Sequence, residues 1–331
     1  MENSEEGQNT SDASEFDDHN MDYILFNEFC KYKTVIKFGS IVVPVFFTTV
    51  VLLSLLGNVL VLVILGLFEN LKSLTNIFIL NLALSDLIFT LGLPFWACSY
   101  IWGWTFGDFM CRSVNFVFSV GFHSSIVFLM LMTIQRYIAV VHPLFDWNGW
   151  QNFSVIPIVA WVFIFASALP AVVYSEVRAE PDSNKLYCAY NSFKAAIGVT
   201  YQQNILFVVA FSVMGFCYIR IIQTILRSQR NSKHRTIRVI FCVVVVFFLG
   251  WAPYNIVIFL QTLTHQQIEP FAECDVSIKL DFALYVCKLL AFAHCFLNPV
   301  LYVFVGEKFR NHLKKLLQKI ESMWTSIKWE W

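Results

Sequence analysis

The chain has 331 residues, of which 57% are hydrophobic, 17% aromatic and only 14% charged. A typical soluble domain is about 25% charged, so this composition excludes an ordinary soluble domain and indicates a membrane protein in one compact unit. The 23 Lys and Arg residues balance the 23 Asp and Glu residues, and we expect no nucleic-acid partner.

A helix needs about 20 apolar residues to cross a hydrocarbon core of about 30 Å. The sequence contains seven segments of this kind and no internal repeat. They are Phe38–Phe68, Ser73–Gly107, Cys111–Val141, Trp147–Ser175, Ala195–Ile219, Val239–Ile268 and Phe282–Gly306. The sequence therefore predicts an all-α membrane protein, a seven-transmembrane helix bundle whose termini lie on opposite sides of the membrane.

The third of these segments is expected to be the centre of the bundle. It has no charged residue between Arg112 and Arg136, and Asn115, Ser119 and His123 recur at every fourth position. Lipid disfavours such polar groups, so this helix should be surrounded by the other helices.

The charge distribution predicts the orientation. If the N-terminus is outside, the inner parts hold 14 Lys and Arg against 5 acids, and the outer parts hold 9 against 17. The positive-inside rule then gives an extracellular N-terminus for a multi-pass plasma-membrane protein. No cleaved signal peptide is expected, because no charged-then-apolar pattern ending in small residues precedes the first span.

Three regions follow from this reading. Residues 1–34 form an extracellular acidic tail, expected to be disordered, since residues 1–29 contain nine acids and no Lys or Arg. Residues 35–305 form the bundle. Residues 306–331 form a cytoplasmic amphipathic helix lying on membrane lipid, followed by a short tail.

The acidic tail has two interpretations. It can be a solvating segment, or it can attract a basic protein ligand to the outer face of the bundle. Tyr23 follows Asp17, Asp18 and Asp22 and is a candidate for sulfation. Asn9 begins a glycosylation sequon on the same side of the membrane.

Asp86 is the only charged residue deep inside a predicted span. Burying a carboxylate in a membrane costs several kcal/mol unless a proton, a partner or a cation neutralises it, so Asp86 is a functional candidate. The structural alternative, of equal weight, is a protonated carboxyl hydrogen-bonded to Ser125 or Asn298. Asn58 in the first span is expected to be a structural hydrogen-bond donor.

Several other features allow a plain structural interpretation as well as a functional one. The aromatic connection Trp102–Gly107 fits the interface belt of membrane proteins. Arg136 at the inner helix end can be a lipid anchor, although no other base lies between Arg112 and Arg178. The basic run Arg220–Arg238 can anchor to anionic lipid or receive a cytosolic partner.

Taken together, one feature in each span forms a specific set. The set comprises Asn58, Asp86, Cys111, Arg136-Tyr137, Trp161, Trp251-x-Pro253 and Asn298-Pro299-x-x-Tyr302. It resembles the rhodopsin-like G-protein-coupled receptors across the whole bundle. Pro253 and its aromatic neighbours Trp251 and Tyr254 also make the sixth span a candidate bending helix.

Within that class the chain resembles the chemokine receptors. The resemblance rests on Trp102–Gly107, on His294-Cys295 before Asn298, on the acidic tail and on four outer cysteines. The runs SLTNIFILNLALSDL, LQTL and NPVLYVFVGEKFRNHLK resemble the XC (lymphotactin) branch of the family.

Cysteine positions agree with a receptor exposed to an oxidising outer side. Cys30, Cys111, Cys188 and Cys274 lie outside the predicted hydrocarbon region, and four cysteines allow three pairings. The resemblance implies Cys111 with Cys188 and Cys30 with Cys274. The other five are expected to be small buried apolar groups. They are Cys98, Cys217, Cys242, Cys287 and Cys295.

The resemblance also implies a ligand and a binding region. A basic chemokine would dock its body on residues 1–30 and on the loop around Cys188, and would insert its N-terminus among the outer helix ends. The ligand-binding positions implied are Tyr23, Trp96, Phe118, Tyr254 and Lys288. Lys288 departs from the family, which often has Glu there, and would favour a carboxylate or an uncharged group over an ammonium.

Signal transmission is implied in the same way. Bending at Trp251 would move the inner end of the sixth helix, so that an inner set of residues rearranges to admit a heterotrimeric G protein, expected to be of the inhibitory class. The inner set is Arg136, Tyr137, Tyr218, Asn298, Pro299 and Tyr302. Gln135 replaces the acid that usually precedes Arg136, so the ion pair of the inactive state is missing and basal activity should rise.

Several points stay open at this level. A sodium ion at Asp86, Ser125 and Asn298 is the only cofactor to consider. Arrestin is a further partner, with few tail hydroxyls to receive phosphate. An enzyme is not expected, because the chain lacks metallopeptidase and nucleophile-elbow motifs. The main alternative function is an atypical chemokine scavenger of the same fold that does not signal.

Overall fold

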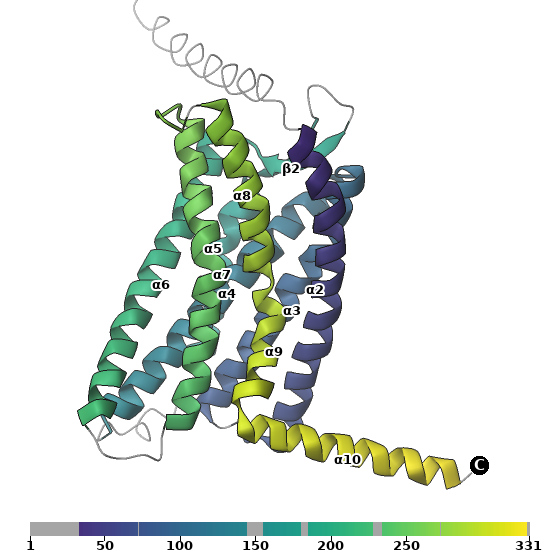
Figure 1. Cartoon of the computed structure of the whole chain (residues 1–331), viewed down its shortest axis with the longest axis vertical. Coiled ribbons are helices and arrows are strands. Elements are labelled where there is room, and N and C mark those ends of the chain that lie inside the picture. Colours follow the sequence, from purple (N-terminus) through teal and green to yellow (C-terminus); the bar gives the residue numbers. More distant parts are fainter. Residues whose placement is uncertain are drawn as a thin grey trace, which may run out of the picture.

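The structure is a computed structural model that describes residues 33–71, 73–143, 155–179, 185–227, 234–271 and 273–329. Its helices are α2 (Lys33–Phe68), α3 (Leu74–Trp102), α4 (Gly107–Val141), α5 (Val155–Val173), α6 (Phe193–Arg227), α7 (His234–His265), α8 (Cys274–Phe292), α9 (His294–Val305) and α10 (Glu307–Trp329). Helices α2 to α9 run along one common direction, and α10 leaves the bundle at one end, nearly perpendicular to it (Figure 1).

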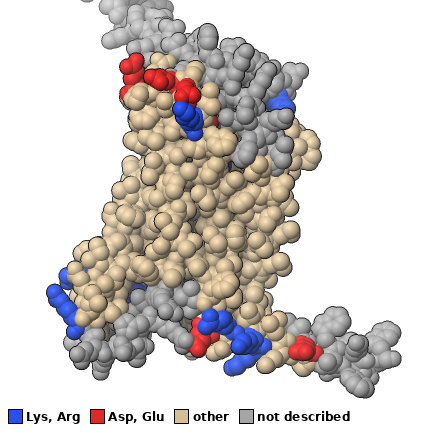
Figure 2. All heavy atoms as spheres, in the orientation of Figure 1, with Lys and Arg blue, Asp and Glu red and all other residues tan. Residues whose placement is uncertain are grey.

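The described helices are suited to a membrane. Six of them are each long and apolar enough to cross it, and the pair α8 and α9, bent by 41°, makes a seventh span when counted as one. Figure 2 shows a broad uncharged belt on this face, with Lys, Arg, Asp and Glu confined to its two ends. The predicted all-α bundle of seven spans with a C-terminal amphipathic helix is therefore confirmed.

Helix α4 occupies the centre, as its polar periodicity predicts. It contacts α3, α5, α6 and α7, and 67% of its apolar stretch is buried, against 22% to 56% in the other spans. Gly121 allows α3 to approach closely, because a Cβ at this position would lie 2.6 Å from Cβ of Phe89. The central helix therefore carries polar groups that its neighbours shield from lipid.

The seventh span differs from its prediction. The sequence suggests one helix over Phe282–Gly306, whereas the structure begins at Cys274 and breaks at Ala293, between α8 and α9. Pro299 has no N–H to give to the carbonyl of Cys295, four residues earlier. That carbonyl instead accepts a hydrogen bond from Asn58 Nδ2 at 2.7 Å. The structural role predicted for Asn58 is confirmed.

The outer loop after α5 forms a hairpin that sequence reasoning did not find. Strands β1 (Ser175–Ala179) and β2 (Leu186–Tyr190) pair antiparallel, with Val177 opposite Cys188. A disulfide joins Cys188 to Cys111 at the outer end of α4. The hairpin therefore lies across the outer end of the bundle, and this half of the implied cysteine pairing is present.

The aromatic connection before α4 is not only an interface belt. Trp102 is exposed, but Trp104 is fully buried and packs with Cys111 and Val114. The backbone N–H of Trp104 donates to the carbonyl of Leu186 at 2.6 Å, so the connection fastens the hairpin. The belt interpretation is wrong for Trp104.

Candidate functional site

A cavity of about 450 Å³ lies at the outer end of the bundle, under β2. Four residues predicted to bind ligand line it together, although they come from four different helices. They are Trp96 on α3, Phe118 on α4, Tyr254 on α7 and Lys288 on α8. The fifth, Tyr23, lies outside the described residues, as do Asn9 and Cys30. Cys274 is itself disulfide-bonded.

One side of the cavity is aromatic and cationic. The ammonium of Lys288 lies 4.5 Å from the ring centroid of Trp96 and 3.4 Å from the hydroxyl of Tyr100. Tyr100 is one helical turn beyond Trp96 on α3, so its place beside Lys288 follows from the facing of α3 and α8. The sequence alone gave no signal for Tyr100.

The other side of the cavity is polar and uncharged. Nδ1 of His123 shares a hydrogen bond with the hydroxyl of Ser167 at 2.8 Å, and Gln202 Nε2 donates to the carbonyl of Ser167 at 2.7 Å. Sequence reasoning recognised His123 as an interior polar group but missed Ser167 and Gln202. Their spans carry no polar periodicity that would have distinguished them.

The hairpin forms the outer wall of the cavity. Asn115 Nδ2 donates to the hydroxyl of Ser175 at 2.8 Å, which ties α4 to β1. Tyr190 at the end of β2 also lines the cavity. Burial raises the pKa of Tyr190 to about 12, so this phenol stays protonated at physiological pH.

Trp251 lies behind the cavity lining and packs against two of the lining residues, Phe122 and Tyr254. Its ring is completely buried, with centroids 4.3 Å from Phe122, 5.5 Å from Tyr254 and 5.2 Å from His294. A displacement of Tyr254 by a ligand would therefore meet the Trp251 ring directly, because interiors are close-packed.

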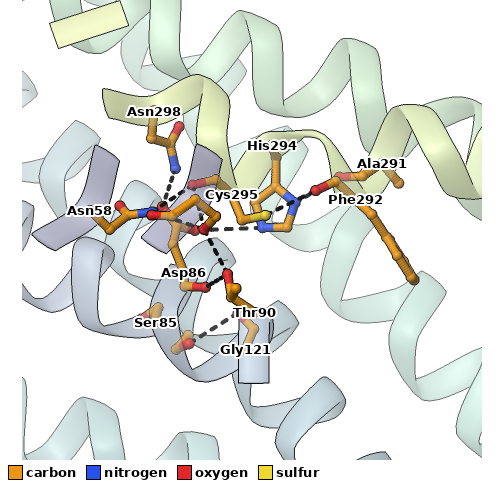
Figure 3. Close-up of polar contacts among 12 residues, drawn as sticks. Asn58, Ser85, Asp86, Thr90, Gly121, Ala291, Phe292, His294, Cys295 and Asn298 are labelled. Carbon is orange, nitrogen blue, oxygen red and sulfur yellow. Dashed lines mark hydrogen bonds and ion pairs between the residues drawn. The ribbon is translucent and has the colours of Figure 1, made fainter. Parts of the chain in front are cut away.

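Below Trp251 lies a polar core around Asp86, which has no exposed surface. Figure 3 shows the carboxylate between Asn298 and His294. Asn298 Nδ2 donates to Oδ2 at 2.8 Å, whereas Oδ1 faces Nε2 of His294 at 3.6 Å. Of the two hydrogen-bond partners suggested for Asp86 by the structural interpretation, Asn298 is present.

The contact between Asp86 and His294 needs either a proton or a cation. Nδ1 of His294 donates to the carbonyl of Ala291 at 2.6 Å, so Nε2 of the neutral ring is an acceptor. It faces Oδ1 of Asp86, another acceptor, and neither atom has a hydrogen-bond partner in the described part of the chain. Two buried acceptors repel unless a cation or a proton lies between them.

Ser125 extends this donor set. Its hydroxyl lies near the Asp86 carboxyl without a hydrogen bond of normal geometry. Carboxylate, hydroxyl and amide oxygens are hard donors of the kind that alkali and alkaline-earth cations prefer. Of the residues predicted to hold sodium, Asp86 and Ser125 have unsatisfied oxygens that fit such an ion, whereas Asn298 turns its Nδ2, a hydrogen-bond donor, toward the carboxylate.

The inner end of the bundle carries the predicted arginine switch. Arg136 Nη2 donates to the hydroxyl of Thr75 at 2.7 Å, and that hydroxyl donates to Oε1 of Gln135 at 3.1 Å. Instead of an ion pair, the hydroxyl of Thr75 connects the side chains of Arg136 and Gln135 by hydrogen bonds. Sequence reasoning missed Thr75.

The predicted switch residues also include Tyr137, Tyr218 and Tyr302. Tyr302 is 5% exposed, and its hydroxyl lacks a hydrogen-bond partner among the described residues. Tyr218 is 7% exposed and stands edge-on to Phe241 at 5.1 Å. Tyr137 bonds through its hydroxyl to His142 Nε2 at 3.2 Å. Buried phenols without full hydrogen bonding have the capacity to make new contacts.

Comparison with known proteins gives a consistent family. Residues 57–302 match the model of the 7 transmembrane receptor (rhodopsin family). The chain is 43% identical to the human chemokine XC receptor 1 over 284 residues, which cover 85% of this chain and 83% of that protein. The mouse chemokine XC receptor 1 is 43% identical over 288 residues, 86% of each chain. The human C-C chemokine receptor type 4 is 36% identical over 318 residues, covering 91% of this chain and 87% of that protein.

Proposed function

Because this chain belongs to the chemokine receptors of the rhodopsin-like family, we propose that it binds a basic chemokine of the XC type outside the cell and activates a G protein inside. It is a multi-pass plasma-membrane protein. The G protein proposed is heterotrimeric and of the inhibitory class, with calcium mobilisation and chemotaxis as the outcome. Arrestin is a further partner under this proposal.

The observation that carries the proposal is the match of 43% identity along most of the chain to receptors of the XC type. Geometry supports a signalling role. Packed contacts lead from Tyr254 to Trp251, from Trp251 to His294 and from His294 to Asp86. These side chains form a continuous packed series from the outer cavity to the polar core. A displacement of Tyr254 would therefore be transmitted to the surroundings of Asp86.

The proposed mechanism uses two proline-weakened helices. Pro253 lies in α7 beside Trp251, and Pro299 lies in α9 beside Asn298. A chemokine N-terminus that displaces Tyr254 would push Trp251 and swing the inner half of α7 outward. Arg136 would then leave Thr75 and face the space opened for the G protein. Such a bundle has two arrangements, and the ligand biases their populations.

Calcium flux in transfected cells tests the function. Cells expressing the full chain are exposed to a panel of chemokines that includes lymphotactin, with and without pertussis toxin to block the inhibitory class. We expect a response to lymphotactin that the toxin abolishes, and no response from Arg136→Ala at equal surface expression. Arg112→Ala, at the outer end of α4, is the matched control.

Two other results have distinct meanings. Saturable lymphotactin binding and uptake without calcium flux in the wild type would favour the scavenger function. The sequence feature that favours a scavenger is Gln135, which replaces the acid that usually precedes Arg136. Absence of both binding and flux with lymphotactin, together with a response to another chemokine, would overturn the XC assignment and keep the receptor function.

A further inference from the structure

The outer cavity has an unbalanced charge. Two cationic side chains, Arg178 and Lys288, line it, and no Asp or Glu does so among the described residues. The other lining groups are aromatic, aliphatic or neutral and polar. The cavity in which the ligand is proposed to insert is therefore positively charged, although the whole chain has a formal net charge of zero.

Lys288 is the source of this positive charge, because Arg178 is already neutralised. Arg178 Nε lies 2.9 Å from Oε1 of Glu176, and its Nη2 donates to the carbonyl of Asn191. The partly buried ammonium of Lys288 forms no ion pair with any described residue. Its nearest groups are the Trp96 ring and the Tyr100 hydroxyl.

Among the described residues, the acid that precedes Lys288 on α8 does not compensate its charge. Asp281 is two helical turns outward on the same helix, about 10 Å along the axis, and its Oδ1 accepts a hydrogen bond from Gln261 at 2.7 Å. The contact with Trp96 is a cation–π interaction, which is weaker than an ion pair in a site of low dielectric. The ammonium therefore retains a capacity to bind an anion.

Two further N–H donors in the cavity lack a well-formed hydrogen bond. Nε1 of Trp96 is buried without a hydrogen-bond partner in the described part of the protein, and Nε2 of Gln203 has the Tyr254 hydroxyl near it without a hydrogen bond of normal geometry. Both residues line the cavity. Buried donors are normally satisfied. Together with Lys288, they make a cavity with a surplus of donors and a positive charge.

We infer that this cavity binds a carboxylate-bearing group and rejects an ammonium. Lys288, Trp96 and Gln203 present donors that need acceptors. A carboxylate supplies a negative charge and up to four acceptor positions for them. A cavity of about 450 Å³ has room for a short acidic peptide segment. The inference rests on the proposed function where the carboxylate is an Asp or Glu in the inserted N-terminus of a chemokine. The preference for an anion is a property of the cavity itself.

The first experiment needs no chemokine. The purified full-length receptor in lipid nanodiscs is titrated with three matched probes, 3-phenylpropanoate, 3-phenylpropanamide and 3-phenylpropylamine, and binding is followed by saturation-transfer NMR. We expect the carboxylate to bind at least about 10-fold tighter than the amide, because the amide loses roughly one charge-assisted hydrogen bond. The amine should bind weakest.

Variants at position 288 separate the charge from packing. Lys288→Arg keeps the cation and should keep the preference for the carboxylate. Lys288→Met keeps the length without the charge and should reduce the ratio of carboxylate to amide affinity to about one. Equal binding of the three probes by the wild type would overturn the inference, as would binding of none or an undiminished carboxylate preference in Lys288→Met.

A charge exchange extends the test to a protein ligand. In lymphotactin, each residue before the first cysteine is changed in turn to Asp, Asn or Lys, and calcium flux is measured. We expect one lymphotactin position at which the wild-type receptor responds best to Asp and the Lys288→Glu receptor responds best to Lys. Flux without any such exchange would overturn the inference and leave the proposed function intact. A wild type that is silent to every variant would contradict the XC assignment, and the fragment result would stand independently.

Discussion

At the scale of single residues, Thr75 has the clearest consequence for signalling. Its hydroxyl connects Arg136 to Gln135 by hydrogen bonds of 2.7 and 3.1 Å. A hydrogen bond to a charged group contributes about 1.5–3 kcal/mol, so its loss shifts a two-state equilibrium by about tenfold or more. We expect Thr75→Val to raise ligand-independent G-protein activation toward that limit, measured as basal nucleotide exchange in membranes.

The matched control for Thr75→Val is Thr75→Ser, which keeps the hydroxyl and should keep the wild-type basal rate. Gln135→Asp tests the same connection from the other side, since an ion pair with Arg136 should lower the basal rate. Equal basal rates in Thr75→Val and the wild type, at equal expression, would show that the connection does not hold the inactive state.

Asp86 carries a second prediction at the same scale. We propose that sodium occupies the position between its Oδ1 and the acceptors nearby, because Oδ1 and Nε2 of His294 are otherwise unsatisfied at 3.6 Å. A bound ion stabilises the folded state by mass action. The unfolding temperature of the purified receptor should therefore be higher in sodium chloride than in N-methyl-D-glucamine chloride at the same ionic strength.

Asp86→Asn is the isosteric control for the sodium experiment, and it should remove the difference between the two salts. If the wild type unfolds at the same temperature in both salts, sodium does not occupy this position. A proton shared by Asp86 and His294 would then be the charge that separates the two acceptors.

At the scale of elements, sequence patterns predicted which segments form the spans and failed at helix ends and breaks. The span of α4 and its central place follow from Asn115, Ser119 and His123, because lipid penalises polar side chains whatever the neighbours are. Near the break at Ala293, Asn58 of α2 satisfies the Cys295 carbonyl that Pro299 frees. Such a partner is 237 residues away in the sequence, so local pattern cannot reveal it.

The same distinction applies to the site. Trp96, Phe118, Tyr254 and Lys288 were expected to meet because the resemblance assigns them a shared pocket, and the structure places all four on one cavity. Tyr100, Ser167 and Gln202 were missed, because each is significant only through a group on another helix. The hairpin of β1 and β2 was missed because its strands are five residues each and lie in a loop.

At the scale of the whole molecule, charge separation predicts the topology. The disulfide-tied hairpin and the cavity lie at one end of the bundle, and α10 leaves from the other (Figure 1). Basic residues dominate the predicted inner parts and acids the outer parts, which places the hairpin outside and α10 inside. An N-terminal epitope tag should therefore be stained by antibody in intact cells, and a C-terminal tag only after permeabilisation.

Every function proposed for the receptor requires the topology that this experiment tests. The cavity can meet a chemokine and Arg136 can meet a G protein only if an odd number of spans separates the two termini. Counting α8 and α9 as one bent span gives that odd number, whereas counting the pair as a re-entrant loop gives six crossings. Staining of both tags in intact cells, or of neither, would show that the pair does not cross the membrane and would remove the physical basis for signalling.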